Sequence, residues 1–337
     1  MSSITTSEGS DRHGGRPADP SEPVTDPFDA LPELAPLRTA AQAGDWAATE
    51  AFFGGLDSVG KVSFAAAALA DLADLAGTEG YLEKAAETLL GDPLPRTLLA
   101  ERYIRIGWKI RSGARAEYVS RDQFDQFHAW LRKAEHLLIE VCAEQPAYGP
   151  AWIPRLLTAR GLELGQSEAR RRYDRLSAHH PHQLRAQSQL LQQLSPKWSG
   201  SFEAMHDFAQ ECVSAASDGS PAGILIAEAH IEHWGQLSDV AGTEYLRNVS
   251  VRNELRHAAE VSVLHTDSRP DWHRLAGHST FALAFSLGGH LKDAAPHFAA
   301  LGNTASESQW RYLGDWKGRY ATYRTAALAT LRGGDGR

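Results

Sequence analysis

The most distinctive polar segment of the sequence is Lys197-Trp198-Ser199-Gly200-Ser201. A lysine and a tryptophan just before a helix could contact a partner, and free backbone amides at a helix start can hold an anion. A packing role explains the same residues, with Trp198 between helices, Gly200 in a tight turn and Ser201 as a helix cap. The packing role is the commoner one. We therefore expect Trp198 to join neighbouring helices, and we keep Lys197 and Trp198 as candidate partner contacts.

Histidine is the next residue type that could do chemistry, since 12 of the 15 histidines fall after residue 178. His230 and His233 lie three residues apart on a predicted helix, close to two glutamates, a spacing that could ligate zinc. No HExxH motif, no Cys–His cluster and no third ligand at a fixed spacing accompanies them. We therefore expect no metal and no cofactor, and interpret the histidines as surface or packed residues.

Two arginines follow Trp152 on one predicted helix. Arg155 and Arg160 are five residues apart, so their side chains diverge by about 140° and cannot reach the same point. Arginine and tryptophan are enriched at binding hot spots. We predict that Arg155, beside Trp152, contacts an acidic or C-terminal carboxylate group of a partner peptide, and that Arg160 is solvated. The run Arg170-Arg171-Arg172 is typical of a charged outer helix face.

Catalytic motifs are not evident. The sequence has no G-x-S-x-G, and its glycine pairs lack the lysine or the strand that a phosphate loop requires. Its two cysteines, Cys142 and Cys212, occupy apolar helical positions, where thiols are usually inert. The sequence leans against an enzyme and leaves the question open.

Composition excludes some classes of protein. The formal charge of -8 over 337 residues disfavours nucleic-acid binding, which needs a basic surface. No stretch approaches 18 apolar residues without a charge, and no signal pattern begins the chain, so we expect neither a membrane span nor secretion. Sparse cysteines fit a reducing compartment. We expect a cytoplasmic protein.

An internal repeat organises the chain. Gly165, Ala169 and Tyr173 return 35 residues later as Gly200, Ala204 and Phe208. A period of about 20–50 residues with helical spacing inside it indicates stacked helical hairpins. Five tryptophans at intervals of 46, 36, 38 and 38 residues supply about one large aromatic side chain per hairpin: Trp152, Trp198, Trp234, Trp272 and Trp310. No segment alternates with a period of two, so we expect little or no sheet.

These residues resemble a known group. Gly289, Ala294 and Phe298, in GGHLKDAAPHF, are similar to the second-helix signature of tetratricopeptide repeats. The segment LSPKWSGS, followed by Met205 and Phe208-Ala209, resembles the marker of an uncharacterised bacterial family of repeat proteins, which is roughly Trp-Gly-Gly-Ser with Met and Phe-Ala downstream. Here a serine replaces the first glycine. The repeat resemblance spans residues 34–301 unevenly; it implies an interaction scaffold and transfers no catalytic residue.

Residues 1–27 contain almost no large apolar side chains, so we expect a disordered tail, followed by one α-helical repeat domain over residues 28–332. The expected fold is all-α, a right-handed superhelix of antiparallel helical hairpins of tetratricopeptide type.

The expected function is a non-enzymatic scaffold that binds a protein or peptide in its concave groove, through Trp152, Arg155, Lys197 and Trp198. The alternative is an α-helical enzyme or accessory factor of a biosynthetic or modification pathway with a small-molecule cavity. A closed pocket with convergent polar groups would favour the alternative, and an open extended groove the scaffold. The sequence does not indicate an oligomeric state.

Overall fold

A computed structural model describes residues 22–72, 78–112, 118–269 and 271–332. Within these ranges the protein is all-α, as the sequence predicts, and its β-type pairing consists of one isolated bridge between Val24 and Thr304. None of the helices in the described ranges has the length and apolarity that a membrane span requires.

The helices vary from one turn to more than six turns. In the first half they are α1 (Pro27–Ala30), α2 (Ala35–Ala43), α3 (Trp46–Gly54), α4 (Val59–Asp71), α5 (Thr78–Thr88), α6 (Pro93–Arg111), α7 (Arg121–Glu144), α8 (Gly149–Gly161) and α9 (Gln166–Ser177). In the second half they are α10 (Leu184–Gln193), α11 (Phe202–Ala215), α12 (Ile224–Trp234), α13 (Asp239–Arg247), α14 (Val249–Glu260), α15 (His273–Leu287), α16 (Leu291–Leu301), α17 (Glu307–Trp310) and α18 (Trp316–Arg332).

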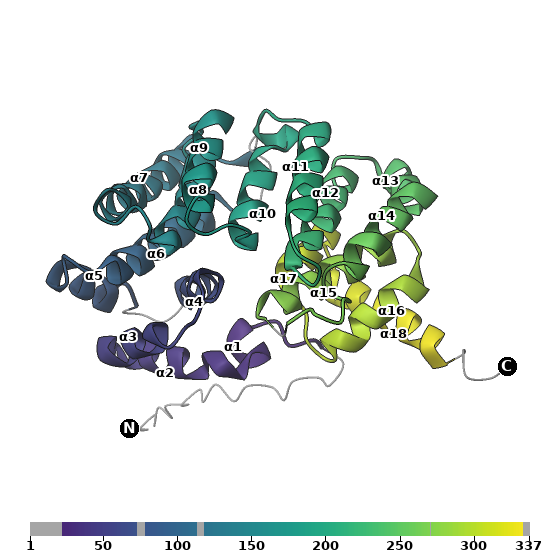
Figure 1. Ribbon diagram of the computed structural model, residues 1–337, viewed down its shortest axis with the longest axis horizontal. Helices are drawn as coiled ribbons and strands as arrows, with labels where there is room; N and C mark the ends of the chain where they lie inside the picture. The colour runs from purple at the N-terminus through teal and green to yellow at the C-terminus, as the bar shows by residue number, and fades with distance from the viewer. Residues whose placement is uncertain (1–21, 73–77, 113–117, 270, 333–337) are drawn as a thin grey trace, which may run out of the picture.

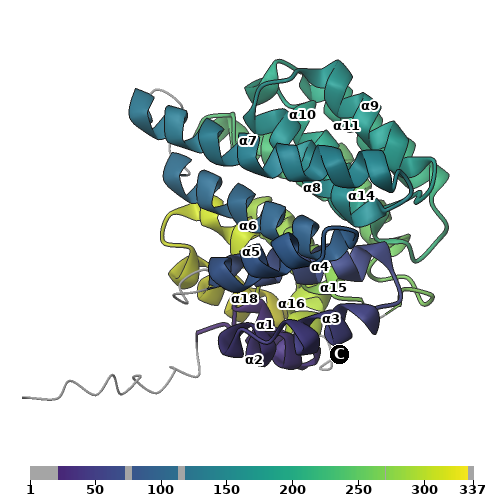
Figure 2. The same ribbon diagram turned by 90° about the vertical axis from the view of Figure 1, so that its left-hand side faces the viewer.

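Helices that are close in sequence pack against each other along most of the chain, for example α2 on α3, α6 on α7, α8 on α9, α11 on α12 and α15 on α16 (Figure 1). Seen from the side, the first half forms successive layers from α7 through α6 and α5 down to α2 (Figure 2). Helices far apart in sequence also contact each other; α4, for example, packs against α8 and α10.

The two ends of the described chain meet. The Val24 amide donates to the Asn303 carbonyl at 2.8 Å, and the Ala305 amide donates to the Val24 carbonyl at 3.0 Å. The Lys317 ammonium pairs with the Glu22 carboxylate at 3.2 Å. The segment before α1 is therefore joined to the loop after α16 and to the first turn of α18.

This junction includes the last residues of the expected tail. Residues 1–21 lie outside the described residues, but residues 22–27 belong to the folded body. Asp26 caps α1 by accepting from the Phe28 amide at 2.8 Å, and Phe28 is buried. A backbone pairing with residues 303–305 holds residues 22–27 although this segment has few large apolar side chains.

Most helix ends follow the expected local signals. Gly44 ends α2 in the left-handed conformation, with a φ of 62°, and Ser120 begins α7 with a complete capping box. Helix α6 begins at Pro93, where Asp92 caps it and proline fits a first turn. Pro296 does not interrupt α16.

The last helical segment of the described chain has two parts. Gly314, with a φ of 67°, separates Trp310 and the short turn after it from α18.

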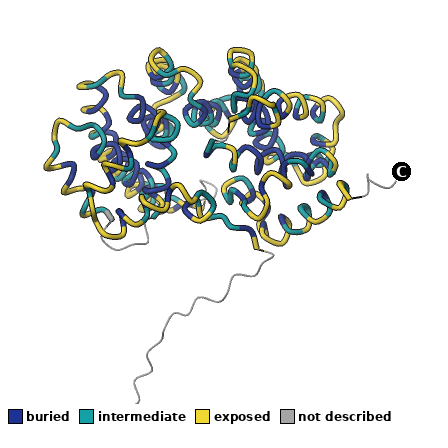
Figure 3. Tube along the Cα trace, turned by 60° about the horizontal axis from the view of Figure 1, so that its bottom comes forward, coloured by how far each residue is buried: buried dark blue, intermediate teal, exposed yellow. Residues whose placement is uncertain are grey.

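The core consists of three hydrophobic clusters, and buried residues occur throughout both halves of the molecule (Figure 3). Trp272 of the second half packs in the cluster of the first helices, where its ring lies 5.6 Å from that of Phe64. Of the five regularly spaced tryptophans, Trp152, Trp272 and Trp310 are buried, whereas Trp198 and Trp234 are only partly buried.

Candidate ligand-binding cavity

A central cavity of about 720 Å³ lies where the inner helices converge. Helices far apart in sequence contribute its wall: α4, α6, α10, α12 and α15, together with the segments around Asp26 and Arg311 at the junction of the chain ends. Apolar side chains such as Phe64, Leu184 and Ile224 share this wall with charged ones. The cavity therefore has the mixed lining that is common in ligand sites.

The charges of the wall balance. Four cationic and four carboxylic side chains line the cavity: Arg105, Lys109, Arg185 and Arg311, and Asp26, Asp71, Glu228 and Glu307. Several are paired within the protein, since Arg105 contacts Asp71 and the Arg311 Nε donates to Glu307 at 3.0 Å. A wall with both signs in equal number disfavours a strongly charged ligand and suits one that carries both signs.

Arg185 is fixed at the base of the wall. Its guanidinium makes two bonds to the buried carboxylate of Glu101, at 2.6 and 3.0 Å, and donates to the Ser63 hydroxyl at 2.6 Å. These bonds join α10 to α6 and α4. They hold the first turn of α10 in place, and with it the cavity residue Ser188, one turn further along the same helix.

Glu228 has the most altered acid–base property among the carboxyl groups of the wall. Burial, together with the nearby Glu232 carboxylate, raises the pKa of Glu228 to about 7, although a hydrogen bond from Ser188 lowers it in part. Burial likewise lowers the pKa of His273, across the cavity on α15. Glu228 is thus an acceptor that changes charge near neutral pH.

An aromatic and charged network continues from Glu228 along the next turn of α12. Glu232 is buried, pairs with the Lys197 ammonium at 2.6 Å and accepts a hydrogen bond from Tyr312. Arg160 lies over the rings of Trp108 and Trp198, at 5.6 and 5.8 Å from their centroids. Burial lowers the pKa of Arg160 to about 10.

The structure therefore separates the four nominated residues into two pairs. Lys197 and Trp198 belong to the network beside the cavity, and the partly buried Trp198 contacts Trp108 of α6 and Arg160 of α8. Trp152 and Arg155 lie elsewhere, between α7, α8 and α9. The Trp152 indole donates to the Pro146 carbonyl at 2.9 Å.

Arg155 is part of a buried ion-pair network. Its guanidinium donates to Glu135 at 2.9 Å, and Arg172 makes bonds of 3.0 and 2.8 Å to the same carboxylate. The side chains of Arg155, Glu135 and Arg172 are 9%, 10% and 3% exposed. Arg160, which we expected to be solvated, is instead partly buried and donates to the Gln189 carbonyl of α10 at 3.3 Å.

The other residues of the arginine run are neutralised locally. Arg171 makes two 2.7 Å bonds to Glu168, and Arg170 pairs with Asp174 at 2.9 Å. Both arginines are about half exposed, as expected for an outer helix face.

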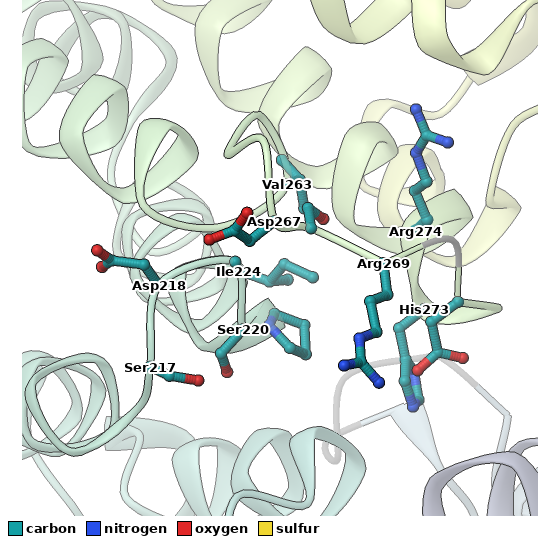
Figure 4. Close-up of a pocket in the computed structure, with 13 residues that line it drawn as sticks. Ser217, Asp218, Ser220, Ile224, Val263, Asp267, Arg269, His273 and Arg274 are labelled. Atoms are coloured by element: carbon teal, nitrogen blue, oxygen red, sulfur yellow. The ribbon is translucent and has the colours of Figure 1, made fainter. Parts of the chain in front are cut away.

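A second cavity, of about 630 Å³, adjoins the first (Figure 4). The loops before α12 and α15 form it, with Ser217 and Ser220 opposite Arg269. Ile224 and His273 line both cavities, so their side chains mark the boundary between the two spaces.

Sequence reasoning missed the central residues of the site, namely Arg105, Arg185, Glu228 and Tyr312. One signal for Glu228 and Glu232 was available, because they are the only acids in the segment ILIAEAHIEHW, which is apolar apart from these two residues and two histidines, and they lie four residues apart. The others could not be found, since only the packing of helices far apart in sequence brings them together.

No family model matches the sequence, and no curated protein is significantly similar to it.

Proposed function

We propose that the chain is a non-enzymatic binding protein whose central cavity holds a small zwitterionic ligand: a free amino acid, or the end of a short peptide that offers the same groups. The proposal rests mainly on the cavity wall, which combines equal numbers of cationic and carboxylic side chains with apolar ones. Glu228 in this wall can accept a hydrogen bond from the ligand. The cavity of about 720 Å³ falls in the usual range of about 300–1,000 Å³ for small-ligand sites. This proposal narrows the expected protein-binding groove to a compact site.

The architecture proposed with it is a right-handed superhelix of antiparallel, tetratricopeptide-like hairpins, closed by the junction of Val24 with Asn303 and Ala305. Closure supports a cavity over an extended groove, because a long peptide could not cross the joined ends. Lys197 and Trp198 remain candidate contacts, since their network adjoins the turn of α12 that carries Glu228.

In this proposal the ligand's ammonium group donates to Glu228 and its carboxylate faces Arg105 and Lys109. The apolar part lies against Phe64 and Ile224. A ligand carboxylate can share Arg105 with Asp71, because both side chains of that pair are partly exposed, at 37% and 45%. The buried Arg185–Glu101 pair stays a structural support.

An enzyme or accessory factor of a biosynthetic or modification pathway is the second candidate. The observation in its favour is Glu228, whose pKa of about 7 suits a group that donates and accepts protons near neutral pH. Chemical change of a bound ligand during incubation would favour this candidate over simple binding.

The test is a calorimetric screen of the full chain against amino acids and short peptides, each compared with its N-acetylated and C-amidated form. We expect the zwitterions to bind and both blocked forms to bind at least tenfold more weakly, because each lacks one charge-assisted hydrogen bond of about 1.5–3 kcal/mol. Comparing the affinities of single amino acids and short peptides shows whether the ligand is a free amino acid or the end of a peptide. Glu228→Gln should weaken binding, and Glu244→Gln, an exposed glutamate on α13, should not. Equal binding of free and blocked ligands would refute the proposal.

A further inference from the structure

Three potential metal ligands converge outside the cavity. His206 of α11, His230 of α12 and Glu254 of α14 each offer one ligand atom, and these atoms all lie within 4.8 Å of one another. His230 is buried, and the other two are partly buried. The site is thus inside the packed helices, with a route to solvent along His206 and Glu254.

The helices that carry these residues pack on each other, α11 on α12 and α12 on α14. Two of them have capped first turns, since the Ser201 hydroxyl accepts from the Ala204 amide at 3.0 Å and Asn248 accepts from the Ser250 amide at 2.8 Å. A site assembled from three packed helices is more precisely held than one on loops.

Outer contacts orient the ligands. The Tyr245 hydroxyl lies 2.6 Å from Nδ1 of His230, which directs Nε2 of the same ring to the Glu254 carboxylate at 3.0 Å. Gln210 donates to the other oxygen of Glu254 at 2.6 Å. Metal-binding histidines usually have such a partner on the second ring nitrogen, and metal-binding carboxylates are usually hydrogen-bonded as well.

We propose that His206, His230 and Glu254 form a zinc site with three protein ligands and one open position. Two imidazoles and one carboxylate are a set that Zn²⁺ accepts, with metal–ligand distances of about 2.0–2.2 Å. Zinc would replace the hydrogen bond between His230 and Glu254 and draw the ligand atoms closer, which the partly exposed side chains of His206 and Glu254 allow. The sequence did not indicate this site because the other two ligands come from other helices, 24 residues before and 24 residues after His230.

The competing explanation is that the same residues form only a hydrogen-bonded support between helices. Two titrations of the metal-stripped full chain distinguish a zinc site from a purely structural cluster: calorimetric titration with Zn²⁺ and optical titration with Co²⁺. We expect one ion per chain and visible Co²⁺ absorption typical of a four-coordinate site. His206→Ala and Glu254→Gln should each lower Zn²⁺ affinity at least tenfold, and Tyr245→Phe about tenfold.

The matched control is His257→Ala, which removes an exposed histidine of α14 outside the trio and should leave affinity unchanged. A second control removes His179, His180 and His182 together, in case exposed histidines bind the ion. Melting curves without metal establish that each variant is folded; Glu254→Gln retains a group that can hydrogen-bond His230. Wild type that binds no Zn²⁺, or affinity that falls equally in trio and control variants, would overturn the proposal.

Discussion

The buried carboxylate of Glu135 provides a prediction that separates the two roles considered for Arg155. Glu135 accepts hydrogen bonds from Arg155, Arg172 and Thr158, and all three partners are buried. Glu135→Ala would leave two buried guanidinium groups without this carboxylate. Removing one partner of a buried ion pair typically costs about 3–5 kcal/mol, a large part of the roughly 5–15 kcal/mol stability of a domain.

Arg155→Ala should cost less, because Arg172 still makes two bonds to Glu135. When Glu135 is removed, Arg172 can still donate to the Glu168 carboxylate, which lies 2.7 Å away. We therefore expect the loss of stability in Glu135→Ala to fall toward the lower end of the range of about 3–5 kcal/mol. The control is Glu140→Ala on the same helix. Glu140 is exposed and pairs with the exposed His136 at 3.3 Å, so its loss should change stability by at most about 1 kcal/mol.

Urea denaturation followed by circular dichroism measures all three variants. The reasoning is refuted if Glu135→Ala unfolds within about 1 kcal/mol of wild type. If Arg155→Ala keeps full stability and instead abolishes ligand binding, Arg155 is a partner contact, as the sequence predicted, and the network is not its main role.

Four further outcomes follow from the structure. Ligand affinity should rise between pH 6 and 8 in wild type but not in Glu228→Gln. The reason is that Glu228, whose pKa is about 7, accepts a hydrogen bond from an ammonium group best when it is ionised. Ligand affinity that does not change with pH in wild type would contradict this role of Glu228. Burial lowers the pKa of His278 to about 4 and that of His297 well below its usual value, so the unfolded chain takes up their protons first. The free energy of unfolding should therefore fall below pH 6.5 by about 1.4 kcal/mol per pH unit for each of these histidines, and the slope should be correspondingly shallower in His297→Leu. A chain that begins at Pro27 should melt at a lower temperature than one that begins at Glu22. The expected loss in the free energy of unfolding is about 2–3 kcal/mol, from the Val24 hydrogen bonds and the Asp26 cap. Equal melting temperatures would show that the junction does not stabilise the fold. Gly200→Ala would place a methyl group 1.9 Å from the Leu194 carbonyl oxygen and should lower the free energy of unfolding by about 1–3 kcal/mol. The control is Gly54→Ala, whose methyl group would meet no atom within 4 Å and should leave stability unchanged in the same urea denaturation assay.

The helices could be predicted from the sequence because their signals are local. Ser201 caps α11 as expected, and Gly44 and Ser120 likewise end and begin helices through contacts with atoms within a few positions. The division at Gly314 was missed because the aromatic spacing continues across it, from Trp310 to Trp316 and Tyr320.

The site could not be predicted from the sequence, because long-range pairing decides which helix face is buried. The divergence of Arg155 and Arg160 followed from helix geometry, but their surroundings did not. Glu135, 20 residues before Arg155, directs that arginine between helices, whereas Trp108 and Trp198 surround Arg160. The ordering of residues 22–27 likewise depends on partners near residue 303.

The most direct test of the proposed function is a crystal structure of the full chain with the zwitterion that binds most tightly in the calorimetric screen. The proposal predicts that the ligand occupies the central cavity, with its ammonium group at Glu228 and its carboxylate toward Arg105 and Lys109. A ligand bound on the outer helix faces, or one in the cavity with no contact to Glu228, would contradict it.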